Sequence, residues 1–209
     1  MKEAIHGVGG IECQVLYELG GEPPVLLLHG YSFRGRTWAE AGVLGALEER
    51  GVRYAAPDMP YGRSTSCTKR TRDWRLNTEL ARAVSDRFLG DSRPVIVGAS
   101  LGGRIALYYA ARYGARGLFL ASPALRENEP VWGMLRAIRA PVVIIRGGRD
   151  FVPRSVHERL ARKLGAELLV YEGAGHAMYL DMPERFVKDL LGFLEKIGGE
   201  GLDLAGRHD

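Results

Sequence analysis

Short, mostly apolar runs alternate with segments of helical periodicity along the chain. Such runs are typical of strands that are buried on both faces of a parallel sheet. They lie at Val25–Leu28, Val52–Ala56, Val95–Val97, Leu118–Leu120, Val142–Ile145 and Leu168–Val170. Apolar positions spaced as in a helix occupy Trp38–Glu49, Asp73–Leu89, Leu101–Tyr113 and Ser155–Leu164. The alternation predicts an α/β fold in which helices cover both faces of a mostly parallel central sheet.

Both ends of the chain depart from this alternation. Apolar residues alternate with polar or small ones over Ile11–Leu19, which predicts an antiparallel strand at the sheet edge, paired with a shorter strand near Ala4–Val8. Pro183–Ile197 has the apolar stripe of an amphipathic helix, and proline suits its first turn. The segment after it is rich in glycine and charge. We therefore expect a single domain over residues 1–197 and a flexible tail over residues 198–209.

The composition is that of one globular domain with a positive net charge. The chain has 209 residues, 46% of them hydrophobic, and a formal net charge of +4. Its arginines are scattered singly among acidic residues, which indicates an ion-paired surface and argues against nucleic-acid binding. The one basic and aromatic cluster, Lys69–Arg75, is expected to be a solvated helix start. No apolar run approaches the length of a membrane span and no secretory signal opens the chain, so we expect a cytoplasmic protein that does not enter a membrane.

The cysteines and the first glycines point to no cofactor or metal. Cys13 and Cys67 have no companion cysteine or histidine at ligand spacing, so neither a structural zinc site nor a disulfide framework is expected. Cys67 is expected to lie in a loop, from which it could approach a pocket. Gly7, Gly9 and Gly10 resemble part of a dinucleotide loop, but they precede the edge strand and open no helix.

The strand expected at Val95–Val97 runs into a Gly-x-Ser-x-Gly turn, Gly98 to Gly102, and then into a helical pattern. This arrangement is typical of a nucleophile on a sharp turn, where the glycines leave room for the neighbouring backbone. The turn also directs the backbone N–H of Leu101 toward a group bonded to Ser100. The alternative is that Ser100 is only a small residue in a tight turn.

Candidate partners for Ser100 follow two other strands. The carboxyl ends of parallel strands meet at one edge of a sheet, so residues that follow these runs are expected to lie close together. Val142–Ile145 leads to Asp150, and Leu168–Val170 leads to His176. A serine hydroxyl needs a base to take its proton, an imidazole suits that role, and a carboxylate fixes the tautomer of the imidazole. Ser100, Asp150 and His176 therefore form a candidate catalytic triad.

Two of these residues have rivals or simpler roles. Asp150 could cap the helix that begins near Pro153, and Asp58, after another strand, competes for the role of the acid. His176 could be an ordinary loop histidine. His29 follows a strand as well, but it is worse placed than His176 for the role of the base.

Five segments, in order, resemble the motifs of the α/β-hydrolase family: His29-Gly30, Asp58–Ser64, Gly98–Gly102, Gly147–Asp150 followed by Val152-Pro153, and Gly175-His176. The resemblance implies that Ser100 is the nucleophile, His176 the base and Asp150 the orienting carboxylate. It also implies an oxyanion hole formed by the backbone N–H groups of Tyr31 and Leu101. The resemblance also excludes the activities of relatives that use an aspartate as the nucleophile, because Ser100 stands at that position.

Many members of this family carry a cap domain between the strands that correspond to Leu118–Leu120 and Val142–Ile145. Here residues 121–141 form that connection, which leaves room for one short helix over Val131–Ile138. This helix is either a partial lid or a covering for the core. We expect minimal or no cap, and an open site that suits small acyl groups.

Loop residues near this site supply candidate substrate contacts. Phe33, Arg63 and Trp132 are expected to touch the substrate. We also expect that one or more of the loop arginines favours an anionic substrate group such as a carboxylate; these are Arg34, Arg36, Arg63 and Arg149.

The expected function is that of a serine hydrolase, most simply a carboxylesterase that acts on a small-molecule acyl ester and needs no cofactor. The segments around His29 and Asp58 resemble a small, cap-poor branch of the family with esterase or deacetylase-type activity, and Tyr61-Gly62-Arg63 departs from the pattern of that branch. The same triad also fits a thioesterase, an acyltransferase or deacetylase, and a peptidase. A non-catalytic interaction protein is the alternative outside enzymes. A monomer or a small homo-oligomer is expected.

Overall fold

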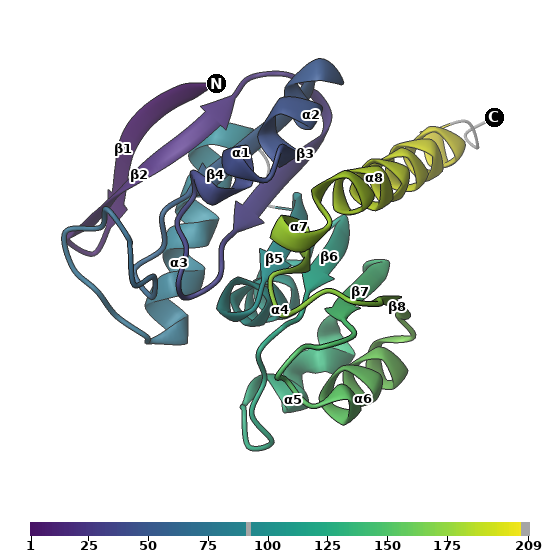
Figure 1. Cartoon of the computed structure of the whole chain (residues 1–209). Coiled ribbons are helices and arrows are strands. Elements are labelled where there is room, and N and C mark those ends of the chain that lie inside the picture. Colours follow the sequence, from purple (N-terminus) through teal and green to yellow (C-terminus); the bar gives the residue numbers. More distant parts are fainter. Residues whose placement is uncertain (91–92, 206–209) are drawn as a thin grey trace.

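The computed structural model describes residues 1–90 and 93–205 (Figure 1). Its strands form one eight-stranded sheet in the order β1-β2-β4-β3-β5-β6-β7-β8. From β4 to β8 neighbouring strands are parallel, whereas β2 runs antiparallel to both β1 and β4. The strands are β1 (Lys2–Val8), β2 (Ile11–Glu18), β3 (Gly21–Leu28), β4 (Val52–Pro57), β5 (Val95–Ala99), β6 (Gly117–Ala121), β7 (Val142–Gly147) and β8 (Glu167–Tyr171). The predicted α/β fold with an antiparallel N-terminal hairpin is confirmed, and the outermost strand of that hairpin is β1.

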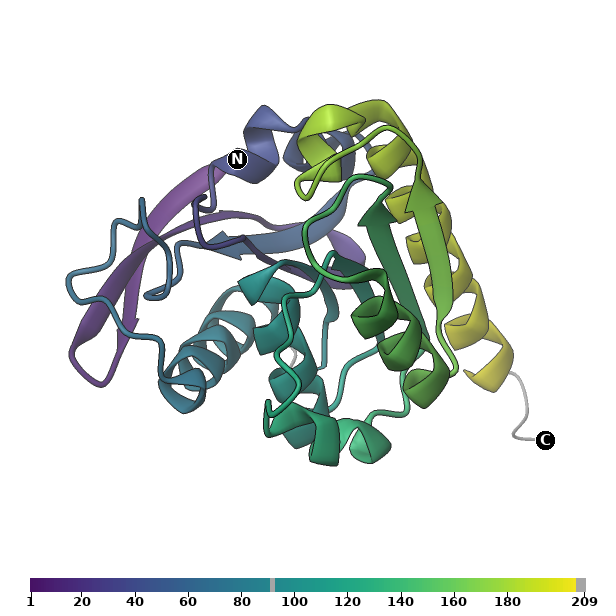
Figure 2. The ribbon, with the colours of Figure 1, turned by 60° about the horizontal axis from the view of Figure 1, so that its bottom comes forward.

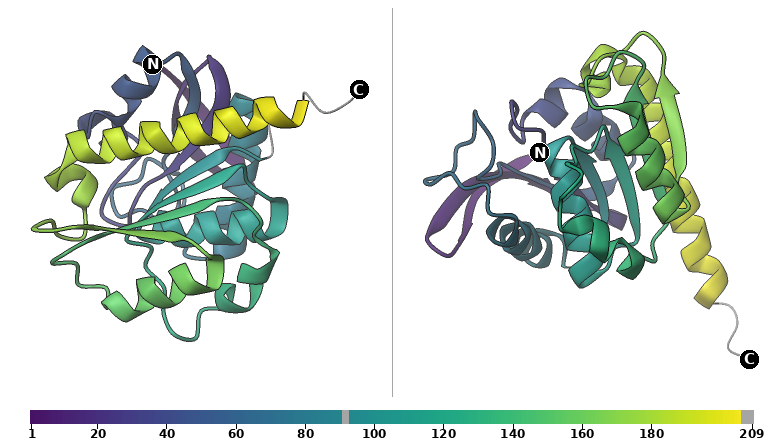
Figure 3. Two further views of the ribbon diagram at one scale, coloured as in Figure 1. Left: turned by 90° about the vertical axis from the view of Figure 1, so that its right-hand side faces the viewer. Right: turned by 90° about the horizontal axis from the view of Figure 1, so that it is seen from below.

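Helices cover both faces of the sheet. On one face pack α1 (Thr37–Glu40), α2 (Val43–Glu49), α7 (Met178–Asp181) and α8 (Pro183–Ala205), and Figure 3 shows α8 crossing that face. On the other face pack α3 (Trp74–Val84) with its π-helical last turn Ser85–Leu89, α4 (Leu101–Tyr113), α5 (Val131–Met134) and α6 (Arg154–Leu164) (Figure 2). Successive side chains of a strand point to opposite faces. In β5, for example, Val95 and Val97 join the core beneath α2 and α8, and Ile96 joins the core beneath α3 and α4.

Helix α8 is longer than its apolar stripe indicates. It begins at Pro183 as predicted and continues past Ile197 to Ala205. Over residues 183–199 its buried hydrophobic side chains are Phe186, Leu190, Phe193 and Leu194. The expected boundary between domain and tail, after residue 197, thus falls inside a helix. Residues 206–209 of the expected tail lie outside the described residues.

The connection between β6 and β7 is short and packs onto the core. It contains α5 and a single 3-10 turn, Leu135–Ala137. Val131 and Leu135 are buried in the core beneath α4. The apolar face of this segment therefore covers the core. In the described ranges, 1–90 and 93–205, no helix combines the length and the apolar character that a bilayer span requires.

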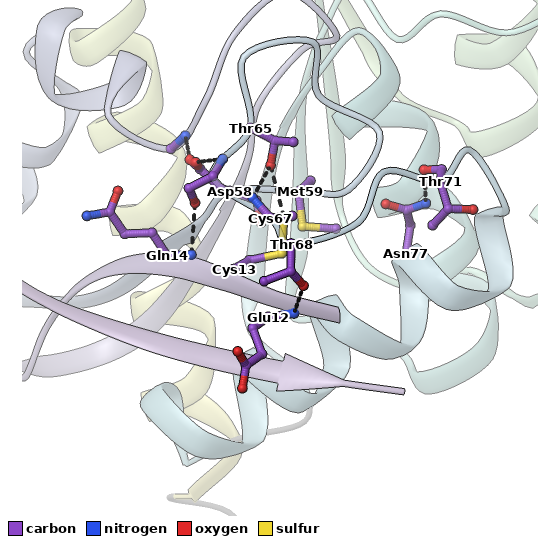
Figure 4. The surroundings of a disulfide bond; sticks show 12 residues. Glu12, Cys13, Gln14, Asp58, Met59, Thr65, Cys67, Thr68, Thr71 and Asn77 are labelled. Atoms are coloured by element: carbon purple, nitrogen blue, oxygen red, sulfur yellow. Dashed lines mark hydrogen bonds between the residues drawn. A yellow bond between two sulfur atoms is a disulfide. The ribbon is translucent and has the colours of Figure 1, made fainter. Parts of the chain in front are cut away.

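A disulfide bond joins Cys13 to Cys67 and corrects the expectation that the two cysteines do not pair (Figure 4). Cys13 lies on β2, and Cys67 lies in residues 58–73, the loop between β4 and α3 that we call the tethered loop. Backbone groups of Glu12 bond to Thr68 in this loop, at 2.8 and 3.0 Å. The N–H of Gln14 donates to Ser66 Oγ at 3.0 Å.

The pairing follows from the topology of the sheet. β2 pairs with β4 through residues 15–18, and the loop that leaves β4 turns back along the preceding residues of β2. Two isolated cysteines have no spacing signature, so only this return of the chain brings them together. Cys67 is held in this bond. It lines neither of the two cavities next to Ser100, which have volumes of about 150 and 630 Å³.

Candidate active site

Ser100 stands on a strained turn between β5 and α4. Its backbone has φ 53° and ψ −112°, a conformation that residues other than glycine rarely adopt. Glycines make the close approach possible: a Cβ on Gly98 would lie 2.8 Å from the carbonyl oxygen of Gly102. A Cβ on Gly102 would collide with the carbonyl oxygen of Leu28. The strand, the turn and the helix place the hydroxyl at the carboxyl edge of the sheet, where strained nucleophile turns occur.

The three predicted triad residues form one chain of hydrogen bonds. Ser100 Oγ lies 2.9 Å from His176 Nε2, and His176 Nδ1 lies 2.7 Å from Asp150 Oδ1. The hydroxyl donates to Nε2 and the Nδ1–H donates to the carboxylate, which is the arrangement a general base needs. His176 comes from the loop after β8 and Asp150 from the loop after β7, so the parallel sheet brings them together.

Asp150 is shielded from solvent and receives three hydrogen bonds. Besides His176, the Ser122 hydroxyl donates to Oδ2, and the N–H of Val152 donates to Oδ1 at 3.0 Å. Burial alone would raise the pKa of the Asp150 carboxyl. The donated hydrogen bonds outweigh burial and hold that pKa below its ordinary value. The carboxylate therefore stays ionised and orients the imidazole.

Ser122 is a site residue that the sequence analysis did not identify. It is fully buried directly after β6 and has a positive φ of 45°. Its own N–H donates to the carbonyl of Ile145 on the neighbouring strand at 2.7 Å. The available signal was its position: a hydroxyl residue follows the Leu118–Leu120 run, at the same sheet edge as the other strand ends.

Two backbone N–H groups beside Ser100 are without an acceptor in the described part of the chain. They belong to Tyr31 and Leu101, the residues expected to form an oxyanion hole. The loop that carries Tyr31 lies against Ser100, since a Cβ on Gly30 would be 3.4 Å from the Cβ of Ser100. The Arg63 N–H donates to the Tyr31 carbonyl at 2.6 Å and so helps to hold this loop.

Two cavities lie beside Ser100. The smaller, of about 150 Å³, is the nucleophile pocket, lined by Gly30, Tyr31, Ser32, Phe33, Ala99, Ser100, Phe151, His176 and Tyr179. The larger, of about 630 Å³, is the arginine cavity, lined by Tyr31, Arg72, Leu101, Arg104, Ala124, Leu125, Arg126, Glu129, Phe151, Val152 and Pro153. Tyr31 and Phe151 belong to both linings, so the two spaces adjoin at these side chains.

Phe151 is a second residue that sequence reasoning missed. Its side chain is 76% exposed, and its ring lies 4.1 Å from the ring of His176, centroid to centroid. The same ring lines both cavities beside Ser100. The signal was its place directly after Asp150.

The expected substrate contacts separate into two groups. Phe33 lines the nucleophile pocket, where its ring meets the ring of Tyr179 edge-on. Arg63 is exposed and lines neither cavity. Trp132 is also outside both linings; its indole N–H donates to the Arg126 carbonyl at 2.8 Å.

Asp58 and His29, the other candidates for the acid and the base, are both hydrogen-bonded to backbone groups of loops. Asp58 accepts from the N–H groups of Gly35 and Ser66, each at 2.7 Å. His29 is buried, its Nδ1–H donates to the Gly30 carbonyl, and its Nε2 accepts from the Met59 N–H, both at 2.8 Å. Burial lowers the pKa of His29, so the ring is neutral and serves as a link between loops. Within the described residues, no three histidine, cysteine or acidic side chains form a group that could hold a metal ion.

The sequence pattern of the family described as "Alpha/beta hydrolase family" matches residues 25–137, more than half of the chain. The chain therefore belongs to the α/β-hydrolase family.

Within the family it is a small ABHD14-like hydrolase with little cap. It is 33% identical over 178 residues to "Putative protein-lysine deacylase ABHD14B" of Rattus norvegicus, covering 83% of each chain. It is 32% identical to "Protein ABHD14A" of Homo sapiens, covering 83% of this chain and 64% of that protein.

Solved structures agree on the fold. The "predicted CIB-like hydrolase" of Thermoplasma acidophilum superimposes with a TM-score of 0.81 at 26% identity, covering 93% of this chain and 98% of the other. A thermophilic esterase of Thermogutta terrifontis superimposes with a TM-score of 0.76 at 18% identity, covering 94% and 99%.

Proposed function

We propose that this chain is a serine hydrolase that cleaves small carboxylic esters through an acyl-enzyme on Ser100. The observation that carries the proposal is the unbroken hydrogen-bonded chain from Ser100 through His176 to Asp150. Its hydroxyl end stands beside the two N–H groups of Tyr31 and Leu101 that have no acceptor in the described residues.

The groups are arranged for two successive acyl transfers. His176 Nε2 takes the proton of Ser100 as the hydroxyl oxygen attacks the ester carbonyl. The carbonyl oxygen, now negative, accepts from the N–H groups of Tyr31 and Leu101. The intermediate collapses, the bond to the alcohol oxygen breaks, and the imidazolium gives its proton to the leaving alcohol. Water then attacks the acyl-enzyme with His176 as base again, which releases the carboxylic acid and restores Ser100.

Amide deacylation is a second candidate. It is favoured by the name of the rat relative, "Putative protein-lysine deacylase ABHD14B", and it would use the same acyl-enzyme with an amine as leaving group. The exposed ring of Phe151 at the rim supports access for a substrate attached to a protein. Parallel assays on 4-nitrophenyl acetate and on an acetyl-lysine peptide distinguish the two candidates.

The proposal is tested with Ser100→Ala. We expect hydrolysis of 4-nitrophenyl acetate to fall by at least about a thousandfold, because the nucleophile of the triad is lost. Covalent labelling by a fluorophosphonate probe should disappear as well. The melting temperature should stay within about 2 °C, since only one hydrogen-bonding atom is removed.

Ser155→Ala, at the exposed start of α6, is the matched control and should retain both labelling and turnover. Wild-type protein that is folded but neither labelled nor active would identify a non-catalytic interaction protein instead.

A further inference from the structure

The arginine cavity is the largest space beside Ser100 and differs in character from the nucleophile pocket. Leu101, Leu125 and Val152 form apolar walls, and the lining also includes three arginines and one glutamate. Leu101 directly follows the nucleophile, so a chain bonded to Ser100 can run across it into the cavity. With about 630 Å³, the space exceeds what a small acyl group fills.

One of the cavity's cations is already neutralised. Arg104 Nη1 lies 2.8 Å from Glu129 Oε2, and the two side chains are only 16% and 13% exposed. The Tyr108 hydroxyl donates to the other carboxylate oxygen at 3.4 Å. The only acid in this lining is therefore committed to Arg104.

Arg72 and Arg126 differ from Arg104 in their ion pairing. Neither forms an ion pair within residues 1–90 and 93–205. The Arg72 guanidinium lies 4.9 Å from the centre of the Tyr31 ring. This position, together with nearby Arg70, lowers the pKa of the Tyr31 hydroxyl. Two uncompensated guanidinium groups thus border a partly apolar cavity, which favours an anion at the end of an apolar chain.

We propose that the arginine cavity binds a carboxylate at the far end of the acyl chain, held by Arg72 and Arg126, so that half-esters of dicarboxylic acids are preferred substrates. The proposal rests on the proposed ester hydrolysis at Ser100. The acyl part of the substrate takes the cavity because the leaving alcohol must meet His176, which lines the other pocket.

The arginines named from the sequence are placed elsewhere. Arg36 is paired with Glu3, and Arg149 donates to the Gly173 carbonyl. Arg34 and Arg63 line neither cavity. A carboxylate preference would therefore come from Arg72 and Arg126, residues that sequence order does not place near Ser100.

The test compares the hemiadipate and hexanoate esters of 4-nitrophenol, whose acyl chains have six carbons each. Wild-type protein should show the higher kcat/KM for the hemiadipate ester. Arg72→Gln and Arg126→Gln should each lower the ratio of the two kcat/KM values roughly tenfold, which is the effect of one charge-assisted hydrogen bond. Most of that change should lie in KM, and added salt should reduce the wild-type ratio.

Arg162→Gln is the control, because Arg162 is exposed in the last turn of α6 and lines neither cavity, so the variant removes an equal charge without touching the site. It should leave the ratio unchanged. Fluorophosphonate labelling of Ser100 in every variant separates this proposal from the proposed function. Labelled protein whose ratio is unaffected by Arg72→Gln and Arg126→Gln, or that does not cleave the hemiadipate ester, would overturn the carboxylate assignment alone. Absence of both labelling and turnover would overturn the hydrolase function.

Discussion

Ser122 is the residue on which the geometry of Asp150 most directly depends. Its hydroxyl binds the carboxylate oxygen that His176 leaves free, and it is fully buried. A buried carboxylate that loses such a donor has less compensation for its desolvation. Sequence reasoning found Asp150 by its place after a strand, but it could not show what holds the carboxylate in position.

Removing this hydroxyl should change the pH dependence of the reaction. Ser122 helps to lower the pKa of Asp150, so Ser122→Ala should raise that pKa toward its ordinary value. As pH falls, the variant carboxyl then takes up its proton first, and activity is lost at a higher pH than in the wild type. At neutral pH we expect a loss of about tenfold in kcat/KM. The measurement is the profile of kcat/KM for 4-nitrophenyl acetate from about pH 2 to 8, which includes the ordinary pKa of an aspartate.

The same sign applies to stability. The lowered pKa of Asp150 contributes to the free energy of unfolding above the pKa of the unfolded chain, and this contribution is lost as pH falls through the folded value. Ser122→Ala should therefore weaken the acid dependence of unfolding. Ser155→Ala is the control for both experiments, and an unchanged activity profile in Ser122→Ala would contradict the role of the hydroxyl.

At the scale of elements, the tethered loop is held in place by its bonds to strand β2. It has no helix or strand of its own, yet it carries Arg72 to the cavity beside Ser100. The disulfide to Cys13 and the hydrogen bonds from Glu12 and Gln14 hold its middle against β2. Its far end is held by the Thr71 N–H, which donates to the Pro60 carbonyl at 3.1 Å.

Loss of the disulfide should loosen this loop and destabilise the protein. In Cys13→Ala/Cys67→Ala we expect the free energy of unfolding to fall by about 2–4 kcal/mol, because the unfolded chain regains the entropy of a long loop. Reductant should lower the melting temperature of the wild type toward that of the variant. The double variant serves as its own control, since its melting temperature should not respond to reductant. A wild-type melting temperature that ignores full reduction would contradict a stabilising disulfide.

At the scale of the whole molecule, one sheet separates two apolar cores. Trp38 is fully buried in the core beneath α8, where its ring meets the ring of Phe186 at 6.1 Å. Trp74 and Trp132 pack against the other core. Both cores share the strands of a single sheet, so disruption of one face removes the support of the other.

We therefore predict that the chain unfolds as one domain. In Trp38→Phe, the remaining Trp74 and Trp132 report on the core beneath α3 and α4. In Trp74→Phe/Trp132→Phe, the remaining Trp38 reports on the core beneath α8. In urea, the fluorescence transitions of both variants, each compared with its own far-UV circular dichroism, should coincide. A fluorescence transition on one face that precedes the loss of circular dichroism would indicate separate units and contradict the single domain over residues 1–197.

The sequence by itself determined the alternation of strands and helices, the turn at Ser100 and the residues that meet it. These features are readable because side-chain periodicity is local, and because parallel strands bring their carboxyl ends to one edge, so that Asp150 and His176 could be placed by their order alone.

The tertiary structure alone decided which further groups surround that site. The hydroxyl of Ser122, the pairing of Cys13 with Cys67, and the position of Arg72 depend on how loops return across strand ends. No local period encodes such returns. They follow from the packing of elements far apart in the chain, which also decides where the charges beside Ser100 lie.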